Sequence, residues 1–375
     1  MEYHRLGDYI HEVNVRNREL RVMNLLGLSI EKKFIPSIAN TIGTDMSAYK
    51  IVQPSQFAYV PVTSRNGEKI TVALYDGEES AIISQAYTIF EIVDQDVLLP
   101  EYLMMWFRRP EFDRYARFHS HGSAREVFDW DELCDVKLPV PPIARQREVV
   151  EEYETLSHRI RLNEQMIAKL EETAQALYRK MFVDGVDKGN LPEGWRMGRL
   201  SEIATITMGQ SPEGETYNFD GQGMIFYQGR TDFGRRFPTA RVYTTSPTRY
   251  AKEGDVLLSV RAPVGDLNVA SHDCCIGRGL ASLRSKVGCQ SYLFYQLQEL
   301  EHVFSVSDDD GTVFGSINKD DLHCIEVVIP TLQEMTVFEE HASVVDKQIG
   351  LKDKEINNLT ELQSLLLARM GKFDR

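Results

Sequence analysis

The sequence of 375 residues lacks the features that mark several large classes of protein. No apolar run approaches the roughly 18 residues that a membrane-spanning helix needs. The first residues do not show the basic and then apolar layout of a secretory signal. The five cysteines include no CxxC spacing, so neither a disulfide framework nor a cysteine zinc site is indicated. We therefore expect a globular cytoplasmic protein with no membrane partner.

Motifs for common catalytic chemistry are also missing. The sequence contains no GxxxxGK[ST] phosphate loop, no GxGxxG after a strand, no GxSxG and no [DN]PP[YF] loop of base methyltransferases. His119 and His121 lack a third ligand at helical or hairpin spacing, so we interpret them as polar loop histidines and expect no metal. Cys274 and Cys275 are interpreted as a buried strand pair. The sequence predicts a protein that is not an enzyme and holds no cofactor.

Positive charge is scarce in the chain as a whole. Its 42 Lys and Arg residues face 56 Asp and Glu residues, which gives a net charge of −14. Because nonspecific affinity for nucleic acid comes from cations that meet phosphates, the chain is not a general polyanion binder. One stretch, residues 228 to 250, reverses this trend with five arginines and a single acid. A solvated surface loop is the simpler interpretation of that stretch, and contact with DNA is the interpretation we favour.

Arginine side chains bind guanine edges and phosphates, and threonine hydroxyls bind phosphates. In the second half of the chain and its neighbouring loops we predict DNA contacts by Gln228, Arg230, Thr231, Arg235, Arg236, Arg241, Thr244, Thr245, Arg249, Arg261 and Arg278. The first half offers Arg65, Lys69, Arg114, Arg117, His119 and Arg125. For this first set, a charged helix end is an equal alternative.

The chain contains an internal repeat. GSAREVFDWDEL at 122 to 133 aligns with GTVFGSINKDDL at 311 to 322 at an offset of 189 residues. The same offset places Pro141 on Pro330 and Met181 on Met370. Near the front of each half, HRLGDYI at 4 to 10 resembles the RLSEI that begins at residue 199, with the offset changed to 194. A constant offset over so long a stretch predicts two similar domains whose loops differ in length.

Each repeat ends in apolar residues at heptad spacing, which predicts a long helix after a proline. One polar residue interrupts each heptad pattern at the same position, Asn163 in the first and Lys352 in the second. Packing of each helix on its own domain is the simpler alternative, but two matched patterns favour antiparallel pairing with these polar residues close together. We predict pairing through Leu156, Ile160, Asn163, Ile167, Val345, Ile349, Lys352 and Ile356.

The predicted fold class is α+β. Two tandem globular domains of mixed helix and strand are joined by two long antiparallel coiled-coil helices, with a pseudo-twofold internal repeat. Strand-like runs lie at 55–62, 69–76, 86–93, 255–262 and 324–330, and amphipathic helices begin near Pro100 and Gln290. The predicted organisation is a first domain at 1–140, a first helix at 141–184, a linker at 185–190, a second domain at 191–330 and a second helix at 331–375.

Five motifs in order resemble the target-recognition domain of Type I restriction-modification specificity subunits: LPEGW, MGQSPEGETYN, FYQGRTDFG, GDVLLSVRAPVGDLN and CCIGRGLASLRS. PVPPIARQREVVEEYETLSHRI resembles the proline-led conserved helix of that family. The resemblance implies two target-recognition domains, one in each half, that bind two half-sites of double-stranded DNA. It implies that the paired helices form the spacer between them.

The resemblance also implies partners and leaves the chain itself without catalysis. Modification subunits, expected in two copies, would bring S-adenosylmethionine and methylate adenine. Restriction subunits would add ATP-driven translocation and cleavage with magnesium. The alternative from another class is a protein-protein assembly scaffold that uses the paired helices, with globular halves that bind other proteins.

Overall fold

The computed structural model describes residues 2–37, 43–64, 67–122, 125–301, 304 and 316–371. It divides into two compact units: unit 1 comprises Met1–Asn163 with Lys354–Arg375, and unit 2 comprises Glu164–Asp353. Each unit contains one part of each of two long helices, α4 (Ile143–Phe182) and α9 (Leu332–Arg369). The predicted contact residue Arg65 lies outside the described residues.

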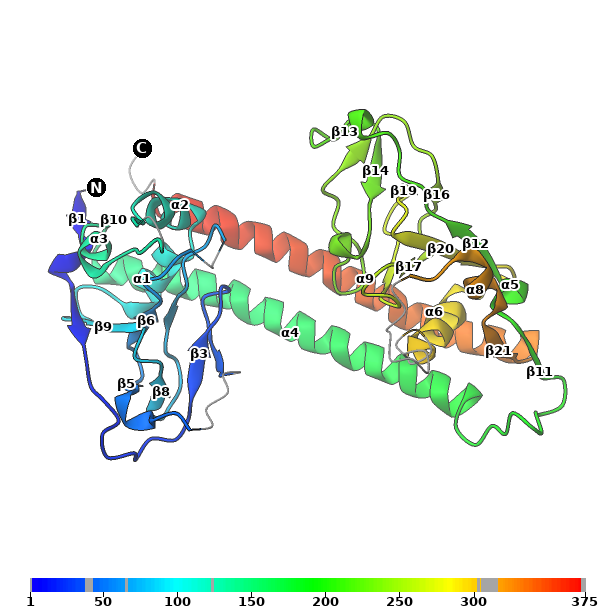
Figure 1. Ribbon diagram of the computed structural model, residues 1–375, viewed down its shortest axis with the longest axis horizontal. Helices are drawn as coiled ribbons and strands as arrows, with labels where there is room; N and C mark the ends of the chain where they lie inside the picture. Colours follow the sequence, from blue (N-terminus) through cyan, green and yellow to red (C-terminus); the bar gives the residue numbers. More distant parts are fainter. Residues whose placement is uncertain are drawn as a thin grey trace. The chain divides into compact units, whose positions relative to one another are not determined.

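Unit 1 is built on a four-stranded antiparallel sheet in the order β2-β9-β6-β7. These strands are Ile10–Val13, Thr88–Ile92, Phe57–Tyr59 and Val72–Leu74. The two central strands of the sheet, β9 and β6, are labelled in Figure 1. Helix α1 (Pro100–Phe107) packs on this sheet, and the ring of Phe107 lies 5.9 Å from that of Phe57 and 6.2 Å from that of Phe90. Fully buried aromatic rings therefore form the centre of this unit's core.

The remaining elements of unit 1 flank that core. They are β1 (Tyr3–Arg5), β3 (Leu26–Leu28), β4 (Phe34–Pro36), β5 (Lys50–Val52), β8 (Ala81–Ile83), α2 (Pro110–Phe118), α3 (Trp130–Cys134) and β10 (Lys137–Pro139). Strands β3 and β4 pair with each other, as do β5 and β8 and, at the two ends of the domain, β1 and β10. Proline occupies the first position of α1 and α2, where its missing N–H costs least.

Unit 2 repeats the four-stranded antiparallel sheet in the order β12-β20-β17-β18. These strands are Ala204–Met208, Leu280–Ser285, Val256–Ser259 and Leu267–Val269, and α6 (Gln290–Glu299) packs on them. A second, five-stranded sheet has the order β13-β15-β14-β19-β16, with strands Tyr217–Asn218, Tyr243–Thr244, Met224–Tyr227, Cys274–Ile276 and Tyr250–Ala251. The unit is completed by β11 (Arg196–Arg199), α5 (Leu200–Ile203), α8 (Lys319–Cys324) and β21 (Glu326–Ile329).

The two units share their strand register as well as their strand order. Strand β1 pairs with β10 so that Arg5 lies opposite Lys137, and β11 pairs with β21 so that Arg199 lies opposite Glu326. These positions are related by the two offsets found in the sequence, 194 at the front of each half and 189 at its end. The predicted α+β fold with an internal repeat is therefore confirmed. The units differ mainly in the strands outside the shared sheet.

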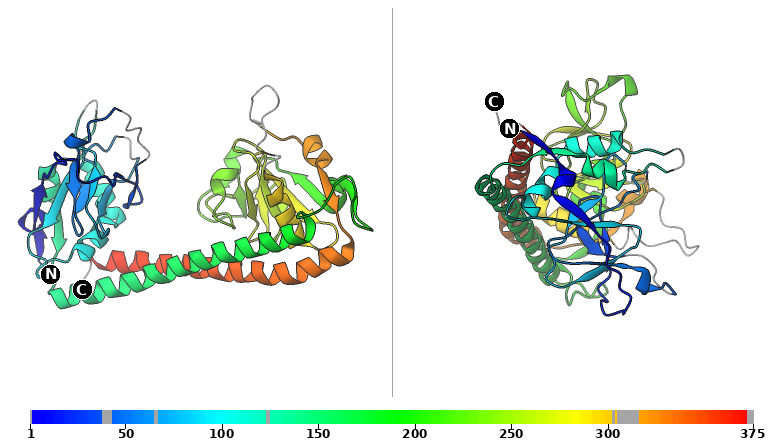
Figure 2. Two further views of the ribbon diagram at one scale, coloured as in Figure 1. Left: turned by 90° about the horizontal axis from the view of Figure 1, so that it is seen from below. Right: turned by 90° about the vertical axis from the view of Figure 1, so that its left-hand side faces the viewer.

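The two long helices run antiparallel within unit 1. Arg159 Nε of α4 lies 2.7 Å from Glu355 Oε1 of α9, and Gln363 Nε2 donates to Ser157 Oγ at 2.8 Å. As the residue numbers fall along α4, the numbers of their contact partners on α9 rise. In unit 1 the sheet lies to one side of the two helical segments, and the same holds within unit 2 (Figure 2).

Unit 2 holds the other ends of the same helices. The Tyr178 ring near the end of α4 lies 5.6 Å from the Phe338 ring near the start of α9, and Phe182 packs on Phe338 at 5.7 Å. Ala174 and Ala342 are buried in the same cluster. The end of one helix thus packs on the start of the other, which confirms the antiparallel direction.

None of the eight predicted helix-pairing residues is exposed. Asn163, Ile167 and Ile349 are buried, and Leu156, Ile160, Val345, Lys352 and Ile356 are half-buried. The side-chain amide of Asn163, 1% exposed, has no hydrogen-bond partner among the described residues. That Asn163 and Lys352 lie close together stays a prediction. None of the helices that the structure describes is long and apolar enough to cross a membrane.

Candidate nucleic-acid interface

Three exposed arginines of unit 2 gather at one edge of its five-stranded sheet, beyond the carboxyl ends of the parallel strands β14 and β19. Arg278 is the first of them. It lies between two glycines, and a Cβ atom on Gly277 or Gly279 would come within 3.0 and 2.8 Å of the Gln228 carbonyl oxygen. Glycine at both positions lets this loop cross the loop after β14 at close range. The arginine is thereby presented next to Gln228, whose side chain is exposed.

Backbone hydrogen bonds bring the other two arginines to the same edge. The Val260 amide donates to the Gly279 carbonyl at 3.0 Å, which places Arg261 beside the glycine loop. The Ile276 amide donates to the Arg249 carbonyl at 2.9 Å. Both arginines are exposed. Arg249, Arg261 and Arg278 therefore lie on three separate loops at this edge of the sheet, which we call the arginine edge.

These three arginines differ from the other predicted arginines of unit 2 because, within the described part of the chain, none of the three lies within ion-pair distance of a carboxylate. Arg230 pairs with Asp266, and Arg241 lies 2.6 Å from Asp232. Uncompensated guanidinium groups on a protein of net negative charge are the groups best suited to meet phosphates or guanine edges.

Arg235 and Arg236 are adjacent in the sequence but have different environments. Arg235 is exposed and lies 3.0 Å from Glu164. Arg236 is 4% exposed, and its Cζ atom lies 3.4 Å from the centre of the Phe294 ring. Its guanidinium lies 2.7 Å from Asp346 of α9. Arg236 is therefore not available to DNA in this conformation and instead holds the domain to the helix.

Thr244 is likewise enclosed. It is 0% exposed, and its hydroxyl lies 2.8 Å from the hydroxyl of Thr216. The structure gives Thr244 a role inside the five-stranded sheet, in place of the predicted phosphate contact. Thr231 and Thr245 are exposed, so a phosphate contact stays a prediction for these two residues. The sequence alone gave no signal that separates these three hydroxyls.

The cysteine pair was interpreted correctly. Cys274 and Cys275 lie in β19 and are both 0% exposed. Burial raises the pKa of the Cys274 thiol to about 12, with the neighbouring Cys275 adding to the effect. A thiol with so high a pKa does not form the reactive thiolate at neutral pH. The pair is part of the core that supports the arginine edge.

Four of the predicted contact residues that the structure describes in unit 1 are exposed, and two of these four lie near a carboxylate. Lys69 and Arg125 are exposed, and Arg114 lies 3.2 Å from Glu111. Arg117 donates to the Gly67 carbonyl at 2.6 Å and lies 3.6 Å from Glu126. Unit 1 therefore also carries exposed positive groups.

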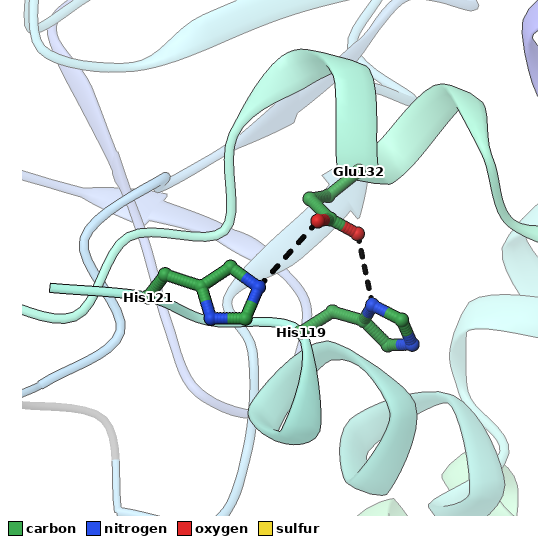
Figure 3. Close-up of side chains that lie close together, drawn as sticks. All are labelled: His119, His121 and Glu132. Atoms are coloured by element: carbon green, nitrogen blue, oxygen red, sulfur yellow. Dashed lines mark ion pairs between the residues drawn. The ribbon is translucent and has the colours of Figure 1, made fainter.

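His119 is half-buried, and the structure places it in a cluster that the sequence did not reveal (Figure 3). Its Nδ1 atom lies 2.9 Å from Glu132 Oε2, and Nε2 of His121 lies 3.5 Å from Glu132 Oε1. Glu132 belongs to α3, so it lies at neither helical nor hairpin spacing from the histidines. Spacing in the sequence therefore could not have identified it as the third member.

Comparison with known proteins agrees with this architecture. Residues 192–361 match the family described as the Type I restriction modification DNA specificity domain. A Methanocaldococcus jannaschii protein named as the MjaX type I restriction enzyme specificity subunit is 27% identical over 86% of this chain and 79% of its own length. The HindI specificity subunit of a type I restriction enzyme from Haemophilus influenzae is 19% identical over 91% of both chains.

A solved structure shows the same fold. The S subunit of a Type I restriction-modification system from M. genitalium superposes with a TM-score of 0.61 over 98% of this chain and 95% of its own, at 13% sequence identity. The matched domain and the two relatives agree with the repeated sheet and the antiparallel helices of this structure. Residues 192–361 thus belong to the Type I restriction modification DNA specificity domain family, and most of the chain is similar to specificity subunits of Type I restriction enzymes.

Proposed function

We propose that this chain is the DNA sequence-recognition subunit of a Type I restriction-modification complex, and that each unit binds one half of a bipartite target. The observation that supports this most directly is the group of Arg249, Arg261 and Arg278 at one sheet edge, three exposed guanidinium groups that have no carboxylate partner among the residues the structure describes. The relatives are named for specificity in restriction enzymes. The repeated fold supplies a second unit of the same design, and this supports a second half-site.

In this proposal the catalytic chemistry belongs to other subunits. Modification subunits bring S-adenosylmethionine and methylate adenine, and restriction subunits bring ATP and magnesium. This chain directs them by binding DNA, without a catalytic role of its own. The domain limits that we propose are 1–140 and 191–330 for the two recognition domains, with the helices at 141–184 and 331–375 and the linker at 185–190.

The proposal can be tested with the chain purified together with its modification subunits. A library of duplexes is methylated, and the preferred sequence is read from the products. We expect a bipartite preference, of which the Arg249→Ala/Arg261→Ala/Arg278→Ala variant loses one half while the other half remains. Loss of up to three phosphate contacts would also reduce the salt dependence of binding, log K against log salt, by about 2 to 3.

A matched control removes the same charge elsewhere in unit 2. Lys188, Arg196 and Lys286 are exposed. Lys188 precedes β11, Arg196 lies in β11, and Lys286 follows the last residue of β20, whereas Arg278 precedes the first. The triple alanine variant of Lys188, Arg196 and Lys286 should keep the wild-type preference. Equal behaviour of the two triple variants would remove this edge from the contact surface. A wild-type complex with no sequence preference at all would contradict the recognition function and favour the alternative, an assembly scaffold.

A further inference from the structure

We propose that His119, His121 and Glu132 of unit 1 form a binding site for a zinc ion. The three side chains converge in the structure although Glu132 comes from α3 and the two histidines from the segment that follows α2 (Figure 3). Each can offer one ligand atom, and these atoms all lie within 4.8 Å of one another. The proposal concerns unit 1 alone and does not depend on the proposed function.

The spacing of the donor atoms fits a tetrahedral ion. With bonds of about 2.0 to 2.1 Å to nitrogen and oxygen, neighbouring ligand atoms of a tetrahedral zinc site lie about 3.3 Å apart. The two distances from the histidines to the Glu132 carboxylate are 2.9 and 3.5 Å. The two imidazoles approach different oxygens of that carboxylate. Small side-chain rotations are therefore enough to bring all three donors around one ion.

The backbone holds the two histidines in place independently of any ion. His121 forms a reciprocal bridge with Val127: the His121 amide donates to the Val127 carbonyl at 3.0 Å, and the Val127 amide donates to the His121 carbonyl at 2.9 Å. His119 ends α2, where its amide donates to the Tyr115 carbonyl at 3.0 Å. The His119 ring stacks on the Tyr115 ring at 4.2 Å. A site whose ligands are already positioned loses less entropy when it binds.

Glu132 is held from its own helix. It lies in the first turn of α3, and its amide donates to the side chain of the N-cap residue Asp129 at 2.9 Å. Among the described residues, the ion-pair partners of the Glu132 carboxylate are the two histidines alone. No lysine or arginine there competes for it. Two neutral imidazoles and one carboxylate carry a single negative charge, which suits a divalent cation.

The donor set selects the class of metal. Magnesium and calcium prefer oxygen ligands throughout, whereas two imidazoles with one carboxylate suit zinc and its neighbours in the first transition row. Three protein ligands leave a fourth position for water or another small ligand. His121 is 71% exposed at its side chain, so the ion has a path to solvent. A bound ion would join the end of α2, the His121–Val127 bridge and α3. It would give His119 a ligand's role in place of a DNA contact.

The test uses the full chain, free of any affinity tag, with zinc chloride and cobalt chloride as probes. We expect calorimetry to show one zinc per chain and zinc to raise the melting temperature. The His121→Ala and Glu132→Gln variants should fold, because one residue is exposed and the other change is conservative. Each should bind zinc at least about 10-fold more weakly than the wild type, since even outer-shell changes cost 10- to 100-fold.

Two controls separate this site from adventitious binding. His272→Ala removes an exposed histidine of unit 2, and Cys324→Ser removes the exposed thiol. Neither should change the affinity for zinc, and bound cobalt should show no charge-transfer band from a thiolate. The proposal is overturned if the wild type takes up no stoichiometric zinc, or if His121→Ala and Glu132→Gln bind it as the wild type does. Zinc binding lost only in Cys324→Ser would overturn it too.

Discussion

The guanidinium of Arg236 lies 2.7 Å from the carboxylate of Asp346, inside unit 2 and between its globular part and α9. The same carboxylate accepts the Tyr295 hydroxyl at 2.9 Å, and the Phe294 ring covers the guanidinium from one side. A buried cation is thus surrounded by a carboxylate, a hydroxyl and two rings. Removing one member of such a buried pair leaves the other charge uncompensated.

We predict that Arg236→Ala lowers the free energy of unfolding of the chain by about 3 kcal/mol, the lower end for a broken buried pair because Asp346 is 23% exposed. Arg235→Ala removes an exposed pair with Glu164 and should cost no more than about 1 kcal/mol. Urea denaturation of both variants measures the difference. Equal losses would show that the two neighbouring arginines do not have the separate roles assigned to them.

The same two variants should differ in the opposite way in DNA binding: Arg235→Ala should weaken it and Arg236→Ala should not. Arg235 stays a predicted contact at the second half-site, so its loss should weaken binding there by about 1 to 3 kcal/mol if it reads a base. Folded Arg236→Ala protein, assayed at low temperature, should keep the preference for that half-site. A double variant would mix the two effects, and the single variants are therefore the informative ones.

A second prediction concerns Arg278, which the two flanking glycines present at the sheet edge. If its guanidinium binds guanine with two hydrogen bonds, Arg278→Ala should cost about 1 to 3 kcal/mol and relax the preference at one base pair. Arg278→Lys keeps the charge but loses the planar fork, so it should relax that preference while retaining more of the affinity. Methylation of a half-site library measures both effects. If Arg278→Lys keeps the full preference, the residue contacts phosphate and does not read a base.

Local patterns in the sequence predicted the shared part of the two units. The strand-like runs at 86–93 and 255–262 contain β9 and β17, and the predicted helices begin at Pro100 and Gln290, where α1 and α6 begin. The heptad patterns correctly predicted α4 and α9, because a repeat of this length and regularity suits a long helix and not a strand. These features depend on the spacing of neighbouring residues, which the sequence shows directly.

The candidate sites depended on contacts that the sequence does not show. Arg235 and Arg236 have the same side chain and are adjacent in the sequence, and the positions of Asp346 and Phe294 in the fold decide which of them is buried. Glu132 joins His119 and His121 because α3 packs beside the end of α2. The strands of the five-stranded sheet are also too short to show an alternating pattern, since several have only two residues.

A third prediction uses the acidity of Glu171, which lies on α4 in unit 2. Burial raises the pKa of its carboxyl group above the usual value, and the nearby Arg236 and Arg235 oppose that shift only in part. A carboxyl whose pKa is raised in the folded state contributes stability below its unfolded pKa and loses it as the pH rises through the folded pKa. The ionised group therefore costs stability at neutral pH.

Glu171→Gln should accordingly be more stable than the wild type at pH 7, and the advantage should shrink as the pH falls towards the ordinary pKa of a glutamate. Chemical denaturation of both proteins between pH 4 and 8 measures this. Glu172→Gln is the matched control, because Glu172 is exposed on the same helix and should show no such trend. A Glu171→Gln variant that is less stable than the wild type at pH 7 would show that the attraction to the arginines outweighs burial.

The last prediction concerns Asn163, whose side-chain amide is buried without a hydrogen-bond partner in the described part of the chain. An unsatisfied buried polar group costs about 1 to 3 kcal/mol, so Asn163→Leu should raise the free energy of unfolding by a comparable amount. A polar residue in the centre of a helix pair persists because it specifies register at a cost in stability. We therefore expect the gain in stability to come with a less uniform assembly, visible as additional species in light scattering after size exclusion.

Gln165→Leu is the matched control, since it adds the same side chain at an exposed position of α4 and should change stability by less than about 0.5 kcal/mol. If Asn163→Leu destabilises the chain, the amide has a partner that stabilises the fold, and the polar interruption of the heptad pattern serves stability and not register.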